Sequence, residues 1–282
     1  MTTILQVLLA GVAFGCIYSL VAVEITLIYS ATNMINFGHE KFIVLGAFIF
    51  GGTLVRQLHL PLAVAAIGAI ALMALFGGVV ANVIFNPLRN MSSDLYAMMG
   101  TVLLANIIRE SIRLIWGPAA FRIEGWLTGT FTTGELIVPK VYVYIIIASV
   151  IFIFLQNMLF MKTKLGRSMR CVSQDKMASA LMGVNVSRNI TITIALSSAV
   201  CCIVALLIIP IFNVDLSMAV MIALKGFAAG VVGGFGTMTG AIAGGLFIGL
   251  LENIYLMIGP ALYKDVVAFV AMILFLLIRP QG

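Results

Sequence analysis

The chain has 282 residues, of which 62% are hydrophobic and only 9% are charged, and its formal net charge is +6. Soluble domains carry about 25% charged residues, so this composition excludes an ordinary soluble domain and indicates an integral membrane protein. The positive balance does not point to nucleic acid, because basic residues gather in the cytoplasmic loops of membrane proteins.

Long apolar segments follow one another along the whole chain and suit helices that cross a bilayer core about 30 Å thick. No stretch alternates in polarity as the strands of a membrane barrel do. We therefore expect an all-α polytopic membrane protein with eight or nine transmembrane helices, one or two of them short or broken, in a single domain over 1–282. The segments are 4–29, 42–55, 60–85, 95–116, 140–161, 190–211, 217–233, 237–258 and 265–279.

The first segment carries Glu24, a charge that costs about 2.5–3.5 kcal/mol near the bilayer centre. Two interpretations stay open, a group on a transport pathway or between helices, and a carboxyl close enough to the cytoplasmic interface to be wet. The junction that follows holds Asn33, Asn36 and His39. These residues favour a helix break with polar groups that face water.

Residues 117–139 include Gly117, Pro118, Gly125, Gly129 and Gly134, next to Trp116 and Trp126. Tryptophan accumulates at membrane interfaces, so we expect an extracytoplasmic loop here. Just before it, Glu110 and Arg113 are spaced to pair on one helix face.

Residues 162–188 form the densest polar block, with six of the 16 Lys and Arg residues and one acid, Asp175. Its positive excess places it on the cytoplasmic side. With nine crossings, the N-terminus is then outside and the C-terminus inside. The four cysteines show no metal-binding pattern and are interpreted as small core residues.

Residues 226–249 contain nine glycines. We expect Gly233, Gly234 and Gly236 to interrupt a helix, and the following small residues to let helices approach closely. Lys225 and Glu252 in the flanking segments have opposite charges and could pair.

An ordered set of short motifs resembles the LivH-type permeases of bacterial branched-chain amino acid ABC importers. The set covers nearly the whole chain, and it consists of Leu27-Ile28-Tyr29, Asn36-Phe37-Gly38-His39, Leu45-Gly46-Ala47-Phe48, Gly166-Arg167, Lys176-Met177-Ala178, Gly183-Val184-Asn185, Leu224-Lys225-Gly226-Phe227, Gly233-Gly234-Phe235-Gly236, Tyr263-Lys264-Asp265 and Arg279-Pro280.

The resemblance implies that this chain is the non-enzymatic permease subunit of an importer in the bacterial inner membrane. Its partners would be a second, LivM-like permease, two cytoplasmic ATP-binding subunits and an extracytoplasmic solute-binding protein, with no nucleic acid. ATP and Mg²⁺ would belong to the ATP-binding subunits, because this chain has no G-x-x-x-x-G-K-[ST] motif and no cofactor or metal site of its own.

The resemblance also gives 162–188 a role as the cytoplasmic coupling loop. A short coupling helix around Asp175 to Val184 would contact an ATPase and end at Gly183. The residues expected in this contact are Arg170, Asp175, Met177, Ala178, Leu181, Met182 and Gly183. The candidates for the translocation path are Glu24, Asn33, Asn36, His39, Gly233, Gly234 and Gly236.

One motif departs from the family pattern. The junction usually reads N-F-A-H-G-E-F, whereas this chain has N-F-G-H-E-K-F, with Glu40 and Lys41 at the changed positions. Urea, short amides or aromatic acids are therefore alternative solutes. The rival classes are an ion-coupled secondary transporter with Glu24 and His39 as its relay, and a membrane scaffold.

Overall fold

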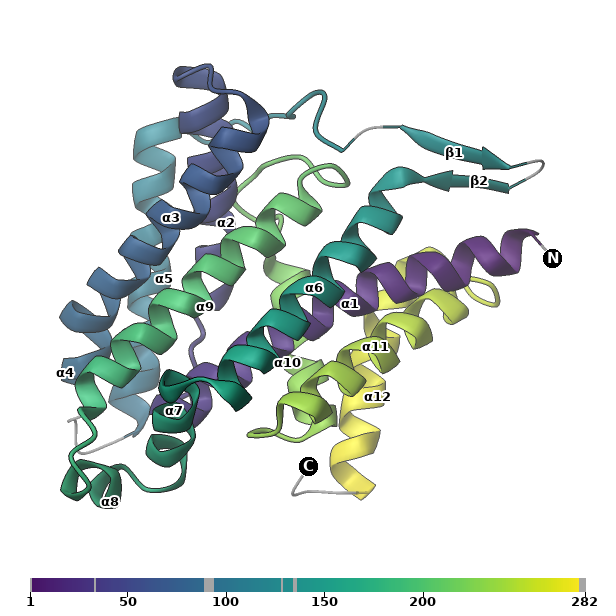
Figure 1. Ribbon diagram of the computed structural model, residues 1–282. Helices are drawn as coiled ribbons and strands as arrows, with labels where there is room; N and C mark the ends of the chain where they lie inside the picture. Colours follow the sequence, from purple (N-terminus) through teal and green to yellow (C-terminus); the bar gives the residue numbers. More distant parts are fainter. Residues whose placement is uncertain (1, 33, 89–93, 128, 134–135, 279–282) are drawn as a thin grey trace. The chain divides into compact units, whose positions relative to one another are not determined.

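The computed structural model describes residues 2–32, 34–88, 94–127, 129–133 and 136–278, and these are mostly helical (Figure 1). Each of the nine apolar segments coincides with a helix, which confirms the all-α polytopic class. The α-helices are α1 (Thr2–Thr32), α2 (His39–Phe48), α3 (Leu62–Val80), α4 (Asn86–Leu88), α5 (Asp94–Trp116), α6 (Lys140–Lys162), α7 (Lys164–Gln174), α8 (Lys176–Leu181), α9 (Val186–Ile208), α10 (Val220–Gly233), α11 (Met238–Tyr255) and α12 (Lys264–Ile278).

Six helical stretches in the described part of the chain are long and apolar enough to cross a membrane. They are Ile4–Thr32, Leu62–Leu88, Lys140–Lys162, Val186–Ile208, Met238–Tyr255 and Ala261–Ile278. Helix α10 is apolar but shorter, and the α2 and α5 segments carry more charge. The protein is therefore polytopic, while eight or nine crossings stays a prediction.

Two segments have the wider π-helical turn, η1 (Ile49–Gln57) and η2 (Ala81–Phe85). Segment η2 joins α3 to α4 without a break, so that Asn86 and Pro87 are helical rather than a turn. Proline has no N–H to donate and disturbs the turn before it, and a local π-turn is one way to accommodate it.

The helices form two compact units, each with its own packing. Unit 1 comprises Met1–Thr26, Ile123–Ile153 and Val220–Gly282, and unit 2 comprises Leu27–Arg122 and Phe154–Ala219. Helices α1 and α6 contribute residues to both units. The single domain expected from the sequence stays a prediction.

Small residues set the packing of α1 against α11 in unit 1. A Cβ on Gly245 would overlap the backbone of Ser19, and a Cβ on Gly249 would overlap that of Gly15. The Ser19 hydroxyl donates to the Ile242 carbonyl at 2.8 Å, a bond that needs this close approach. These contacts confirm that the glycine-rich stretch serves helix packing.

We expect Gly245→Ala to lower stability by about 1–3 kcal/mol, because the added methyl group must push α1 and α11 apart. The measurement is the thermal unfolding midpoint of the protein in detergent. Gly68→Ala in α3 is the matched control, because its Cβ would lie 3.5 Å from Leu54 Cδ1, an ordinary contact. Equal midpoints for the two variants would contradict the close approach.

Helix α9 is the centre of unit 2 and packs against both α2 and α3. A Cβ on Gly46 of α2 would lie 2.9 Å from Cys202 Cα, and a Cβ on Gly77 of α3 would lie 2.9 Å from the Ile194 carbonyl oxygen. The aromatic rings of Phe48 and Trp116 meet at the far end of α2, with centroids 5.8 Å apart. Unit 2 is thus held by small-residue contacts along α9 and by an aromatic cluster.

The 117–139 segment is more ordered than the expected connecting loop. Strands β1 (Thr130–Thr133) and β2 (Leu136–Pro139) form an antiparallel hairpin that leads into α6 (Figure 1). Within unit 2, Phe121 forms a two-way backbone bridge with Val214. No alternating pattern in this segment is long enough to predict the hairpin from residues alone.

Candidate functional site

The basic segment 162–188 folds as two short helices, and the first of them, α7, is joined to α6 by a tight corner. The Thr163 hydroxyl accepts a hydrogen bond from the Gly166 amide at 3.0 Å and thereby caps α7. A Cβ on Gly166 would overlap the carbonyl groups of Leu159 and Phe160. Glycine at this position therefore lets the chain turn immediately after α6.

Helix α8 is short but is capped at both ends. Asp175 Oδ1 accepts hydrogen bonds from the amides of Met177 at 2.8 Å and Ala178 at 3.0 Å. At the other end Gly183 has a φ of +83°, which favours glycine, and its amide donates to the Ala180 carbonyl at 3.0 Å. These caps define a one-and-a-half-turn helix that would be marginal on its own.

One face of α8 is apolar and exposed. Met177 is 78% exposed, and Leu181 and Met182 are each 85% exposed. The other face is turned inward, where Ser179 is buried. Such a surface has no stabilising role in the chain itself, so it is suited to contact with another protein.

The helix predicted around Asp175–Val184 is thus present, but it is shorter and ends at Leu181. Helix α7 was not predicted, although the capping residue Thr163 and Gly166 were the available signals. Arg170, expected in the contact, is half-buried and lies beside the Met161 carbonyl, with Nη2 at 3.4 Å. Cys171 on α7 is exposed, which corrects its interpretation as a core residue, while the other three cysteines are buried.

The α1–α2 junction is closed by internal hydrogen bonds. The Thr32 hydroxyl accepts from the Met34 amide at 3.2 Å, and Asn36 Oδ1 accepts from the Gly38 amide at 2.9 Å. The Phe37 amide donates to the Thr101 hydroxyl of α5 at 3.3 Å. The predicted helix break is therefore present. Backbone amides that it leaves without helical partners donate hydrogen bonds to side-chain oxygens of the chain itself. Asn33 lies outside the described residues.

The side chains of Asn36 and His39 are buried rather than facing water, which corrects the sequence-based expectation. His39 begins α2, and its Nε2 lies 3.5 Å from Cys201 Sγ of α9. Glu24 is also buried, at 1% exposure, and α1 continues for eight residues beyond it. The structure therefore contradicts the interpretation of Glu24 as a solvent-exposed carboxyl near the cytoplasmic interface.

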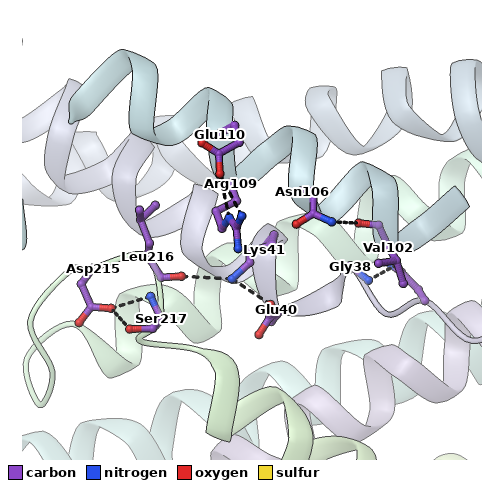
Figure 2. A network of polar contacts seen from close by, with 11 residues as sticks. Gly38, Glu40, Lys41, Val102, Asn106, Arg109, Glu110, Asp215, Leu216 and Ser217 are labelled. Carbon is purple, nitrogen blue, oxygen red and sulfur yellow. Dashed lines mark hydrogen bonds and ion pairs between the residues drawn. The ribbon is translucent and has the colours of Figure 1, made fainter. Parts of the chain in front are cut away.

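Lys41 is the centre of a polar network in unit 2, shown in Figure 2. Its side chain is only 9% exposed, and Nζ lies 2.8 Å from the Glu40 carboxylate. The same ammonium donates to the Leu216 carbonyl at 3.2 Å (Figure 2). Lys41 thereby ties α2 to the non-helical segment 209–219, whose backbone groups need partners inside an apolar protein.

Segment 209–219 also stabilises itself next to Lys41. Asp215 Oδ1 accepts hydrogen bonds from the Ser217 amide at 2.6 Å and the Ser217 hydroxyl at 2.8 Å (Figure 2). On α5, Arg109 and Glu110 form an exposed ion pair at 3.0 Å, with Arg113 at 3.8 Å on the same carboxylate. The predicted Glu110–Arg113 pair is therefore confirmed, and Arg109 joins it.

A second charged cluster lies in unit 1 and joins four helices. Lys225 Nζ of α10 lies 2.7 Å from Glu252 Oε1 of α11 and 2.6 Å from Asp265 Oδ1 of α12. The Tyr18 hydroxyl of α1 donates to Glu252 Oε2 at 3.0 Å. Lys225 and Glu252 are almost fully buried, so this cluster confirms the predicted pair and adds Asp265, which the sequence did not indicate.

The glycine-rich break forms the turn between α10 and α11. Gly234 and Gly236 have φ values of +83° and +96°, and a Cβ on Gly233 would overlap the backbone of Gly240. The predicted interruption at Gly233, Gly234 and Gly236 is therefore present. That this turn lines a translocation path stays a prediction.

The fold, with its apolar helices, short basic helices and buried charge clusters, defines the chain as a polytopic α-helical membrane protein. A family model for the permease component of branched-chain amino acid transport systems matches residues 7–276. The chain belongs to this family. It is accordingly a multi-pass protein of the inner membrane, and the six long apolar helices among the described residues agree with several crossings.

Similarity to curated relatives extends over nearly the whole chain. The LivH permease of the high-affinity branched-chain amino acid transport system of Salmonella typhimurium is 27% identical, over 99% of this chain and 94% of its own length. BraD of the corresponding Pseudomonas aeruginosa system is 28% identical over the same shares. A probable LivH permease of Methanocaldococcus jannaschii is 24% identical, over 98% and 91%. No solved structure matches the chain.

Proposed function

We propose that this chain is the membrane-spanning permease subunit of an ATP-driven importer for branched-chain or related amino acids. It receives solute from an extracytoplasmic binding protein and pairs with a second, LivM-like permease rather than with a copy of itself. Two cytoplasmic ATP-binding subunits carry the ATP and Mg²⁺, and the family membership of this chain supports this division of labour.

The observation that carries the proposal is the exposed apolar face of α8. Met177, Leu181 and Met182 stand out from a capped helix in the most basic segment of the chain. An ATP-binding subunit that covers this face removes apolar surface from water, which is worth about 25 cal/mol per Å². Movement of that subunit then moves α8.

The candidates for the solute path are buried polar residues and one helix break. In unit 2 these are Asn36 and His39 at the α1–α2 junction, and in unit 1 they are the buried Glu24 and the partly exposed Gly233–Gly236 turn. Asn33 is kept as a candidate on sequence grounds. The Glu40–Lys41 ion pair, at 2.8 Å, adds two charged groups to the polar residues of the junction.

Reconstitution tests the proposal. Proteoliposomes with the purified four-subunit complex, ATP in the lumen and the binding protein outside are expected to accumulate radiolabelled leucine. Omission of ATP or of the binding protein is expected to abolish uptake, and a protonophore is expected to have no effect.

The rival functions predict other results in the same experiment. Uptake by this chain alone, driven by a pH gradient and indifferent to ATP, would identify an ion-coupled transporter. A complex that hydrolyses ATP and moves urea or an aromatic acid but no leucine would support the alternative solutes.

A further inference from the structure

The side chain of Lys176 joins α8 to the end of α1. Lys176, the first residue of α8, donates a hydrogen bond from Nζ to the carbonyl oxygen of Thr32 at 2.7 Å. Thr32 is the last residue of α1 and is buried, and Lys176 is half-buried. Both residues belong to unit 2, so this contact lies within one compact unit.

One face of α8 contacts the rest of unit 2, and the opposite face is exposed. Lys176 and Ser179 are three residues apart and lie on the inward face, since side chains at this spacing share one side of a helix. Met177 and Leu181 lie on the exposed face. Any rigid displacement of the exposed face therefore also displaces the Lys176 ammonium.

The acceptor of this bond is a helix end, which makes the contact a strong one. The last carbonyl groups of a helix have no intrahelical partner and carry the negative end of the helix dipole. A lysine ammonium that donates to such a carbonyl forms a charge-assisted hydrogen bond. Lys176 thus holds α1 at the point where its regular backbone ends.

From Thr32 the chain leads directly into the α1–α2 junction, which short hydrogen bonds hold in place. The Thr32 hydroxyl accepts from the Met34 amide at 3.2 Å, Asn36 Oδ1 accepts from the Gly38 amide, and the Phe37 amide donates to Thr101 of α5. Displacement of Thr32 therefore displaces the segment that holds the candidate path residues Asn36 and His39.

We infer that Lys176 is a positioning residue that transmits movement of α8 to the α1–α2 junction through the Thr32 carbonyl. This inference rests on the proposed function, in which an ATP-binding subunit moves α8. It differs from the docking contact itself, because Lys176 lies on the face of α8 that is turned away from the exposed apolar residues.

Lys176→Met tests this inference in the complete complex, with leucine as the transported probe. The substitution keeps the length and apolar stem but removes the donor. We expect the ATP-binding subunits to co-purify in the wild-type ratio and ATP hydrolysis to continue, while leucine uptake per ATP hydrolysed falls about tenfold, a typical size for loss of coupling between sites. Lys176→Arg retains a charged donor and is expected to restore most of the uptake.

Cysteine labelling at the junction supplies a second measurement. The nucleotide dependence of the labelling rate would not change if Lys176 only stabilised the fold. In a Cys171→Ser background, Phe37→Cys places a thiol at a half-exposed position of the junction. We expect its maleimide labelling rate to differ between the nucleotide-free and vanadate-trapped complex. Addition of Lys176→Met is expected to abolish that difference.

Two results would overturn the inference. Wild-type uptake per ATP in Lys176→Met, together with an unchanged labelling difference, would show that movement reaches the junction by another route. Loss of the ATP-binding subunits from Lys176→Met would place the residue in the docking contact. A wild-type complex that contains no ATP-binding subunit would instead refute the proposed function.

Discussion

Lys225→Met is expected to lower the stability of the protein by about 3–5 kcal/mol, the usual cost when one partner of a buried ion pair is removed. The substitution preserves side-chain length, yet it leaves the Glu252 and Asp265 carboxylates, both of which now contact the Lys225 ammonium, without that shared partner. The measurement is the thermal unfolding midpoint in detergent, followed by the yield of assembled complex.

The same cluster offers a matched control. Lys264→Met removes an ammonium that is 42% exposed and lies 3.6 Å from Glu252 Oε1. A partly exposed pair at this distance contributes about 0–1 kcal/mol, so we expect a small change. If both methionine variants unfolded at the same temperature, the buried cluster would not be what joins α10, α11 and α12.

Met177→Asp combined with Leu181→Asp is expected to separate the chain from its ATP-binding subunits. Each apolar side chain that becomes buried in the contact is worth about 1.5–3 kcal/mol, and a carboxylate placed there adds a desolvation cost. Because about 1.4 kcal/mol corresponds to a tenfold change in affinity, we expect binding to weaken by about a hundredfold or more. Co-purification and ATP-driven leucine uptake measure the effect.

The double variant is expected to fold normally, because the two side chains are 78% and 85% exposed. Its thermal unfolding midpoint should match that of the wild-type chain. Exchange of the two residues, Met177→Leu with Leu181→Met, keeps the surface apolar and is expected to retain binding. Stoichiometric ATP-binding subunits on the Asp variant would exclude α8 as the coupling contact.

Several features of this protein follow from residues that are adjacent in the sequence. The caps of α8 are an example, because Asp175 bonds to amides two and three positions away and Gly183 adopts its positive φ through its own backbone freedom. The turn at Gly234 and Gly236 is another. Such signals are local, so they are readable before any packing is known.

The sequence did not predict which side of each membrane helix packs against its neighbours. A helix in a bilayer is apolar toward lipid and apolar toward its neighbours, so polarity does not mark the packed side. For this reason the burial of Asn36 and His39 was not foreseen. The bond from Lys41 to Leu216 and that from Lys176 to Thr32 likewise join residues 175 and 144 positions apart.

The sequence by itself determined the membrane class, the positions of the apolar segments, the basic segment and the ordered motifs of the permease family, because each depends on composition or on neighbouring residues. Only the tertiary structure decided that Asp265 joins Lys225 and Glu252, that Lys41 holds segment 209–219, and that Lys176 reaches the end of α1. These contacts depend on which helices pack together, and the packing is fixed by small-residue approaches such as that of Gly245 to Ser19.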